Sequence, residues 1–224
     1  MKKPKNILTD TFKRKHTYLR ISLTERCNLR CTYCMPAEGV PLSPKSHIMT
    51  FEEIYTIAKT FVAHGVTKIR LTGGEPFVRK DISVILKKLA SLPIELAITT
   101  NGITLDRHIA VLKENNILNI NVSLDTLIPN KFKEITRRDK FEKVYSNILL
   151  LVENGFHVKI NAVLMKDFNE DEIIDFVKLT KDLPVSFRFI EFMPFDGNKW
   201  DLKNMISYAE VMQKVKSYFS EEQI

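Results

Sequence analysis

Hydrophobic positions along the chain follow two periods, one typical of strands and one typical of helices. Short runs with aliphatic residues at every second position alternate with longer segments whose apolar residues stand three or four positions apart. The runs that predict strands are 18–23, 68–72, 95–100, 119–124, 157–164 and 185–191. The segments that predict helices are 51–64, 81–90, 106–114, 129–135, 141–153, 170–181 and 207–219. This alternation predicts right-handed βαβ units and a parallel sheet.

Six predicted strands, each followed by helical sequence, indicate the α/β class and an incomplete six-stranded parallel (β/α)6 barrel. Two helix starts carry a capping-box pattern, Thr50 with Glu53 and Ser207 with Glu210. We expect residues 1–17, which are polar and basic, to form a flexible arm. Residues 18–224 are long enough for one core domain with a full hydrophobic core.

The predicted strands are not uniformly aliphatic, as parallel strands covered on both faces usually are. Because successive side chains point to opposite faces, Ile21 and Leu23 share one face and Arg20 the other. Each buried polar group that is not paired costs roughly several kcal/mol of folding free energy. We therefore expect the polar face to line a wet, cationic cavity that holds a ligand. Its charges are Arg20, Arg70, Lys159 and Arg188, and the alternative is internal ion pairing with Glu75, Asp125 or Glu191.

All three cysteines of the chain stand in one loop after the first predicted strand, at Cys27, Cys31 and Cys34. Iron-sulfur cubes are usually held by four cysteines, so three thiolates on one loop would leave one iron with an open position. Structural zinc is bound by four ligands, and no histidine stands within the loop to complete the set. A disulfide framework requires an even number of cysteines and an oxidising compartment. The spacing favours the cluster over zinc or a disulfide.

The cysteine loop resembles that of the radical S-adenosylmethionine (radical SAM) superfamily, and its flanks resemble the GTP 3′,8-cyclases, which begin molybdenum cofactor biosynthesis. The loop alone, C-x3-C-x2-C with an aromatic residue before the last cysteine, is specific only for the superfamily. Further matching stretches in the same order are similar to the cyclases. These stretches are 18–36, 70–76, 99–102, 120–125, 158–161 and 188–193.

The resemblance implies a radical SAM type of barrel, a single three-cysteine 4Fe-4S cluster and S-adenosylmethionine as cofactors. It assigns the cluster to Cys27, Cys31 and Cys34. Positions that match cofactor-binding residues of the family are Tyr33, Gly73, Gly74, Glu75, Ser123 and Met193. Positions that match GTP-binding residues are Arg20, Arg70, Thr99 and Lys159. The glycines Gly73 and Gly74 are expected to let backbone approach a ligand closely.

The activity implied by the resemblance is that of a lyase of the radical SAM superfamily. Cleavage of S-adenosylmethionine at the reduced cluster gives a 5′-deoxyadenosyl radical, which starts cyclisation of GTP to (8S)-3′,8-cyclo-7,8-dihydroguanosine 5′-triphosphate. An electron donor such as flavodoxin or ferredoxin is implied as a partner. The first step needs no acid-base pair, so no catalytic side chain is assigned.

One region of the family is missing from this sequence. The cyclases carry three more cysteines in a C-terminal part, for a second cluster that binds the guanine, whereas no cysteine follows Cys34 here. A protein partner or a second copy of the chain could close the barrel. Two other readings stay open: a radical SAM enzyme on another substrate, a peptide or a nucleotide, and a non-catalytic truncated metal-binding module.

Composition and charge limit the class of protein, the kind of ligand and the cellular compartment. The 224 residues include 44% hydrophobic and 27% charged residues, as in an ordinary globular protein. A net charge of +7 fits a polyphosphate ligand. The sequence has no basic patch interleaved with aromatic residues, which is the pattern typical of nucleic-acid binding. No apolar run is long enough to span a membrane, and the basic N-terminus lacks the apolar segment of a secretory signal. We expect a cytoplasmic protein.

Overall fold

The computed structural model describes residues 7–194 and 201–220. Its six strands form one sheet in the order of the sequence, from β1 to β6, and the pairs β1–β2, β2–β3 and β5–β6 run parallel. The predicted α/β class with an incomplete six-stranded parallel arrangement is confirmed. The strands are β1 Tyr18–Ser22, β2 Lys68–Thr72, β3 Glu95–Thr100, β4 Asn119–Ser123, β5 His157–Leu164 and β6 Val185–Glu191.

The chain divides into two compact units. Unit 1 comprises Met1–Asn28, Pro41–Thr100 and Thr104–Ile120, and unit 2 comprises Leu29–Val40, Asn101–Ile103 and Asn121–Ile224. The predicted division into an arm, 1–17, and a core, 18–224, stays a prediction, and residues 1–6 of the arm lie outside the described residues.

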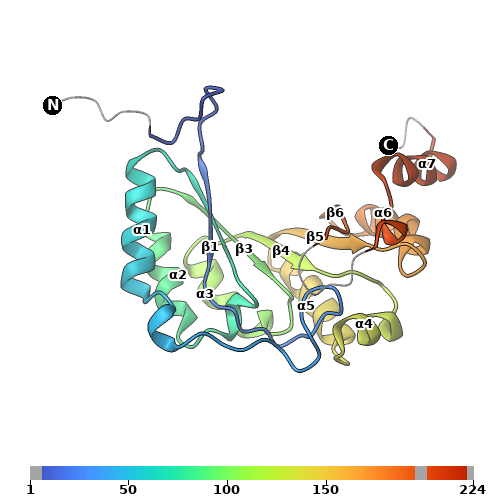
Figure 1. The fold of residues 1–224 in the computed structure, drawn as a ribbon, viewed down its shortest axis with the longest axis horizontal. Helices are drawn as coiled ribbons and strands as arrows, with labels where there is room; N and C mark the ends of the chain where they lie inside the picture. Colours follow the sequence, from blue (N-terminus) through green and yellow to red (C-terminus); the bar gives the residue numbers. More distant parts are fainter. Residues whose placement is uncertain (1–6, 195–200, 221–224) are drawn as a thin grey trace. The chain divides into compact units, whose positions relative to one another are not determined.

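Unit 1 holds the first three strands and three helices. In Figure 1, helices α1 and α2 lie side by side. The capping box predicted at Thr50 is confirmed, because its hydroxyl accepts from the Glu53 amide while the Glu53 carboxylate accepts from the Thr50 amide. The predicted helix 106–114 begins instead as a 3-10 turn, Leu105–Arg107. The helices are α1 Phe51–Ala63, α2 Ile82–Ala90 and α3 Ile109–Glu114.

Unit 2 holds strands β5 and β6 and four helices. The predicted helix 170–181 starts as a 3-10 turn, Glu170–Glu172, before its α-helical part. The capping box predicted at Ser207 is present and opens the last helix. A small core of Leu164, Ile173, Ile206 and Val215 joins that helix to the unit. The helices are α4 Pro129–Thr136, α5 Phe141–Glu153, α6 Ile173–Asp182 and α7 Tyr208–Tyr218.

The predicted strand faces are confirmed by burial. On β2, Ile69 and Leu71 are completely buried, and on β5 Ile160 and Ala162 are as well. Side chains of the opposite face range from exposed to buried, and Arg20 is exposed. The aliphatic face therefore supplies the core, by the hydrophobic effect, and the polar face carries the charged residues of the predicted site.

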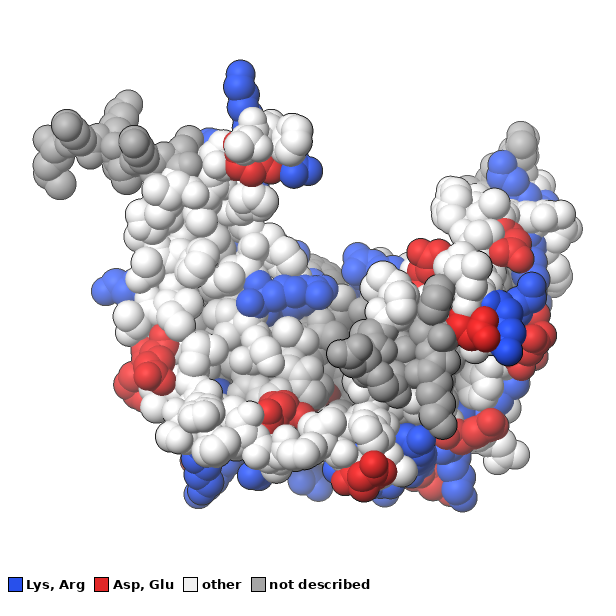
Figure 2. Space-filling model, viewed as in Figure 1, with Lys and Arg blue, Asp and Glu red and all other residues white. Residues whose placement is uncertain are grey.

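The surface charges are largely mixed. On the face drawn in Figure 2, Lys and Arg atoms lie among Asp and Glu atoms. Several lysines are held in ion pairs, such as Lys68 with Glu95 and Lys88 with Glu52. Within the described residues, no helix has the length and apolar character needed to cross a membrane.

Candidate functional site

The cysteine loop begins in unit 1 and continues in unit 2. Cys27 belongs to unit 1, while Cys31 and Cys34 belong to unit 2. The amides of Cys34 and Met35 both donate to the Cys31 carbonyl, at 3.0 and 2.9 Å. The spacing between the last two cysteines therefore closes a single tight turn. Cys34 is exposed and the other two cysteines are half-buried.

The start of the loop is held by the segment that follows β2. The β1–β2 ladder continues past both strands, with the Leu23 amide donating to the Thr72 carbonyl at 2.9 Å. The Gly74 amide then donates to Thr24 at 2.6 Å, and the Glu75 amide donates to Arg26 at 2.7 Å. These bonds fix the backbone up to the residue before Cys27.

Two glycines make this close approach possible. A Cβ atom on Gly73 would overlap the Thr24 backbone, and one on Gly74 would overlap the backbone of Arg26. Gly73 also has φ of +147°, which other residues rarely adopt. In the structure these glycines approach the backbone that leads into the cysteine loop. Their predicted contact with a ligand stays a prediction.

Glu75 fixes the same turn from inside unit 1. Its side chain is 1% exposed. One carboxylate oxygen accepts from the Thr100 hydroxyl at 2.8 Å and from the Phe77 amide at 3.1 Å. The carboxyl group thus joins the ends of β2 and β3. These hydrogen bonds replace the water that a polar group loses when it is buried.

The end of the loop is held by helix α4 in unit 2. The Thr32 amide donates to Ile135 at 2.8 Å, and the Arg30 amide donates to Thr136 at 3.1 Å. The Arg137 guanidinium donates to the carbonyls of Arg30 and Met35, at 2.7 and 3.1 Å. Both ends of the cysteine loop are therefore fixed by backbone hydrogen bonds.

Tyr33, between the last two cysteines, contacts the end of β4. Its hydroxyl donates to Asp125 Oδ2 at 2.9 Å, and Asp125 Oδ1 accepts from the Val163 amide at 2.9 Å. Asp125 is 5% exposed. Burial raises the pKa of the Asp125 carboxyl to about 6, although both hydrogen bonds oppose the shift. Burial and the neighbouring Asp125 charge raise the pKa of Tyr33 well above its usual value.

Three of the residues predicted to bind GTP lie together in unit 1. Arg20 and Arg70 are direct partners in the β1–β2 register. The Arg70 guanidinium donates to the Thr99 hydroxyl at 3.3 Å and to the Tyr18 hydroxyl at 2.7 Å, and Arg20 donates to the same phenol at 3.3 Å. Two guanidinium groups side by side suit a polyphosphate. Neither is ion-paired within the described residues, contrary to the alternative reading.

Tyr18 was missed by the sequence reasoning. It shares a strand face with Arg20, so the alternation that selected the arginine also includes it. Burial alone would raise the pKa of Tyr18, but the hydrogen bond from Arg20 and the nearby Arg70 charge outweigh it and lower the pKa. The phenol thus acts as the shared acceptor that holds two cations next to each other.

The remaining predicted residues belong mostly to unit 2. Lys159 is half-buried on β5, Ser123 is half-buried at the end of β4, and Met193 is 60% exposed after β6. Asn161 follows Lys159 on the same strand face and was not selected from the sequence. Its side-chain oxygen is buried and has no hydrogen-bond partner in the described part of the chain. A ligand that donates an N–H group would satisfy it.

The donor set fits an iron-sulfur cluster. All three cysteines are outside any disulfide and lie on a loop whose ends are both fixed. Among the described residues, no group of three or more His, Cys, Asp and Glu side chains surrounds one point as ligands of a single ion would. A cube differs from such a site because its cysteines bind separate iron atoms.

Comparison with known proteins gives one family match and close relatives. The Radical SAM superfamily matches residues 21–180. The chain is 56% identical to the mitochondrial GTP 3′,8-cyclase of Arabidopsis thaliana over 96% of its own length and 56% of that protein. It is 45% identical to the GTP 3′,8-cyclase of Peptoclostridium acidaminophilum, over 95% of this chain and 67% of that protein. The chain thus spans between about half and two thirds of these relatives.

The fold is also that of a solved structure. Streptococcus suis SuiB bound to S-adenosylmethionine has a TM-score of 0.73 with this chain, at 21% identity, over 92% of this chain and 48% of SuiB. At that identity the likeness supports the fold alone.

We predict that Gly73→Ala destabilises the protein far more than Gly65→Ala. Both glycines have positive φ, but a Cβ on Gly65 meets nothing within 4 Å. The control should therefore lose about 1 kcal/mol of unfolding free energy from strain alone, and Gly73→Ala about 3 kcal/mol or more. Denaturant unfolding measures both, and equal losses would show that Gly73 does not have to approach Thr24.

We predict that Asp125 makes stability depend on pH. Its pKa of about 6 in the folded protein lies above the ordinary value of 3.8, so the folded state binds the proton more tightly. Its contribution is complete below the ordinary pKa and is lost as the pH rises through 6. Relative to Asp125→Asn, the wild type should lose about 2 kcal/mol between pH 4 and 7. Urea unfolding of both proteins measures the difference, and a constant difference would contradict the shift.

Proposed function

Because the chain belongs to the radical SAM superfamily and, within it, to the GTP 3′,8-cyclase family, we propose that it cleaves S-adenosylmethionine and starts the cyclisation of GTP. The observation that carries the proposal is the cysteine loop, which is fixed at its start by Gly74 and Glu75 and at its end by α4. Thiolates on a fixed loop supply a preorganised set of ligands.

The cluster ligands in this proposal are Cys27, Cys31 and Cys34, which leave one iron open. When bound, the 4Fe-4S cluster supplies the electron that cleaves S-adenosylmethionine to methionine and a 5′-deoxyadenosyl radical, which removes a hydrogen atom from substrate. The chain's own residues bind and orient both small molecules. The residues proposed to contact S-adenosylmethionine are Tyr33, Gly73, Gly74, Glu75, Ser123 and Met193.

GTP is the proposed substrate because of the charge gathered around Tyr18. Arg20 and Arg70 flank that phenol, and Thr99 accepts from Arg70. Guanidinium groups donate paired hydrogen bonds to phosphate oxygens, so Arg20 and Arg70 together orient a triphosphate. Lys159 on β5 is proposed as a further phosphate ligand, and Asn161 beside it has an unsatisfied acceptor for an N–H group of the substrate.

The proposed compartment, electron donor and protein partner follow from the same chemistry. Exposed thiol ligands require a reducing compartment, so we place the chain in the cytoplasm. Each cleavage consumes one electron, so a flavodoxin or ferredoxin is the proposed donor. A second copy or another protein is the proposed partner at the outer strands of the sheet, β1 and β6.

The proposal is tested by anaerobic reconstitution with iron and sulfide, followed by reductant, S-adenosylmethionine and GTP labelled with deuterium at C3′. Deuterium should appear in 5′-deoxyadenosine, and mass analysis should find the cyclised dihydroguanosine triphosphate. Cleavage of S-adenosylmethionine without deuterium transfer would assign the chain to another substrate. Absence of cleavage by the reconstituted, reduced protein would refute the enzymatic proposal.

We predict that Cys31→Ala abolishes formation of 5′-deoxyadenosine, by a factor of at least about 1,000, because two thiolates hold the cube poorly. Thr32→Ala is the matched control, since its exposed side chain lies next to Cys31 and its amide still donates to Ile135. The control should stay within about twofold of wild type. Iron content and 5′-deoxyadenosine yield are the readouts, and full activity of Cys31→Ala would overturn the ligand assignment.

We predict that Arg70→Met raises the KM for GTP by about 10- to 100-fold, because one charge-assisted phosphate contact is lost. Cleavage of S-adenosylmethionine without GTP should be unchanged. Arg107→Met, at an exposed arginine of the turn before α3, is the control and should change neither value. Steady-state kinetics with varied GTP measure the effect, and an unaltered KM would remove Arg70 from the substrate site.

A further inference from the structure

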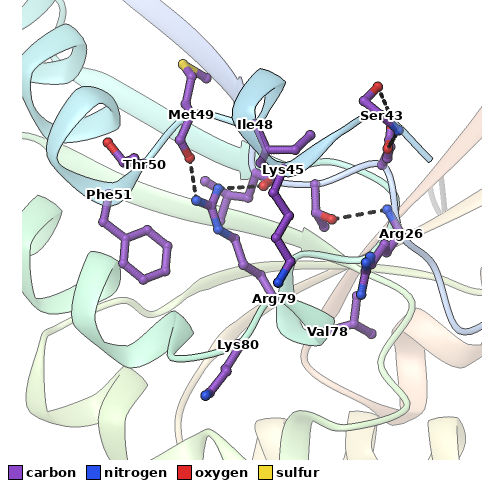
Figure 3. A pocket seen from close by; sticks show the side chains of 13 residues that line it. Arg26, Ser43, Lys45, Ile48, Met49, Thr50, Phe51, Val78, Arg79 and Lys80 are labelled. Carbon is purple, nitrogen blue, oxygen red and sulfur yellow. Dashed lines mark hydrogen bonds between the residues drawn. The ribbon is translucent and has the colours of Figure 1, made fainter.

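A basic hollow lies in unit 1 beside the start of the cysteine loop. It has a volume of about 480 Å³ and is lined by residues from the segments 23–26, 43–51 and 78–80. Figure 3 shows Arg26, Lys45 and Arg79 around this space. Neither the cysteines nor the residues proposed to bind GTP line it. We call it the basic hollow below.

The charges in the basic hollow are mostly positive. Its lining includes four cations, Arg26, Lys45, Arg79 and Lys80, and a single carboxylate, Glu25. That carboxylate accepts from the Ser43 amide and, at 3.0 Å, from the Ser43 hydroxyl. None of the four cations is ion-paired in the described ranges, unlike Lys68 or Lys88 elsewhere in unit 1. Arg26, Lys45 and Lys80 are exposed.

Arg79 places a fixed charge in the lining of the hollow. Its guanidinium donates to the Leu23 carbonyl at 2.6 Å and to the Met49 carbonyl, and lies 4.5 Å from the centre of the Phe51 ring. Burial lowers the pKa of Arg79, but an arginine remains charged at neutral pH. Carbonyl dipoles and an aromatic face stabilise this charge, but no carboxylate among the described residues pairs with it, so an external anion is attracted to it.

The position of the hollow connects it to the cluster loop. Arg26 immediately precedes Cys27 in the sequence, and its carbonyl accepts from the Glu75 amide at 2.7 Å. A molecule seated over Arg26 and Lys45 is therefore next to the first cysteine of the loop. The proposed function requires one electron at this loop for every S-adenosylmethionine cleaved.

We propose that the basic hollow and its exposed cations, Arg26, Lys45 and Lys80, form the docking surface for the acidic protein that delivers this electron. The inference rests on the proposed function and says where its electron donor docks. In the transfer, the hydroquinone flavin of a flavodoxin loses one electron and becomes a semiquinone, while the cluster gains that electron. Complementary charge speeds such encounters and orients the partners.

The test compares two charge-reversal variants with the same change in net charge. Lys45→Glu/Lys80→Glu alters the hollow, and the control Lys59→Glu/Lys87→Glu alters exposed lysines of α1 and α2 that do not line it. Each reconstituted protein is mixed anaerobically with reduced flavodoxin or with reduced methyl viologen. Cluster reduction is followed by visible absorbance, without S-adenosylmethionine or GTP, and thermal unfolding verifies that both variants fold.

The hollow variant should be reduced by flavodoxin about 10- to 100-fold more slowly than wild type at low salt. The control variant should stay within about threefold, and reduction by the small cation methyl viologen should not slow in either protein. At high salt the advantage of the wild type should largely disappear.

Three outcomes would overturn the docking surface. These are an unchanged flavodoxin rate in the hollow variant, an equal loss in the control variant, and an equal loss with methyl viologen. Binding of inorganic phosphate to the hollow, lost in the variant while the flavodoxin rate stays the same, would identify a small-anion site instead. Normal reduction by flavodoxin without later cleavage of S-adenosylmethionine would count against the proposed function and not against the docking surface.

Discussion

The structure depends on one backbone interaction, the pairing of the Gly74 and Glu75 amides with the carbonyls of Thr24 and Arg26. It extends the β1–β2 ladder beyond the ends of both strands, so two loops meet as if they were strands. Side chains at Gly73 and Gly74 would prevent this meeting. The conformation of the chain just before Cys27 is therefore set by main-chain hydrogen bonds. These depend more strongly on angle and distance than side-chain packing does.

The other end of the cysteine loop is fixed in a different way. Backbone bonds to the end of α4 hold residues Arg30 and Thr32, and the hydrogen bond from Tyr33 to Asp125 adds a side-chain contact. Asp125 is buried with two donors, which is the arrangement expected of a charged or partly charged group inside a protein. The cysteines thus belong to a loop whose neighbouring residues are held by hydrogen bonds at both ends.

Much of this arrangement was predictable from the sequence, since it depends on local periodicity. Strand alternation separated Arg20 and Arg70 from the aliphatic face, and the Thr50 and Ser207 capping boxes were readable from residue types alone. The contact of Tyr33 with Asp125 joins positions 92 residues apart, and no local pattern indicates it. The meeting of Gly73 with Thr24 is equally hidden, because backbone-to-backbone bonds leave no pattern in the side chains.

The central claim is that three thiolates hold a cube with one iron open to S-adenosylmethionine. The most direct measurement is electron-nuclear double resonance on the reduced protein, reconstituted with iron and sulfide and given S-adenosylmethionine labelled with 15N in its amino group. The account predicts the spectrum of a reduced 4Fe-4S cluster with a 15N coupling to one iron. A mononuclear metal at Cys27, Cys31 and Cys34, or a cluster without any 15N coupling, would contradict it.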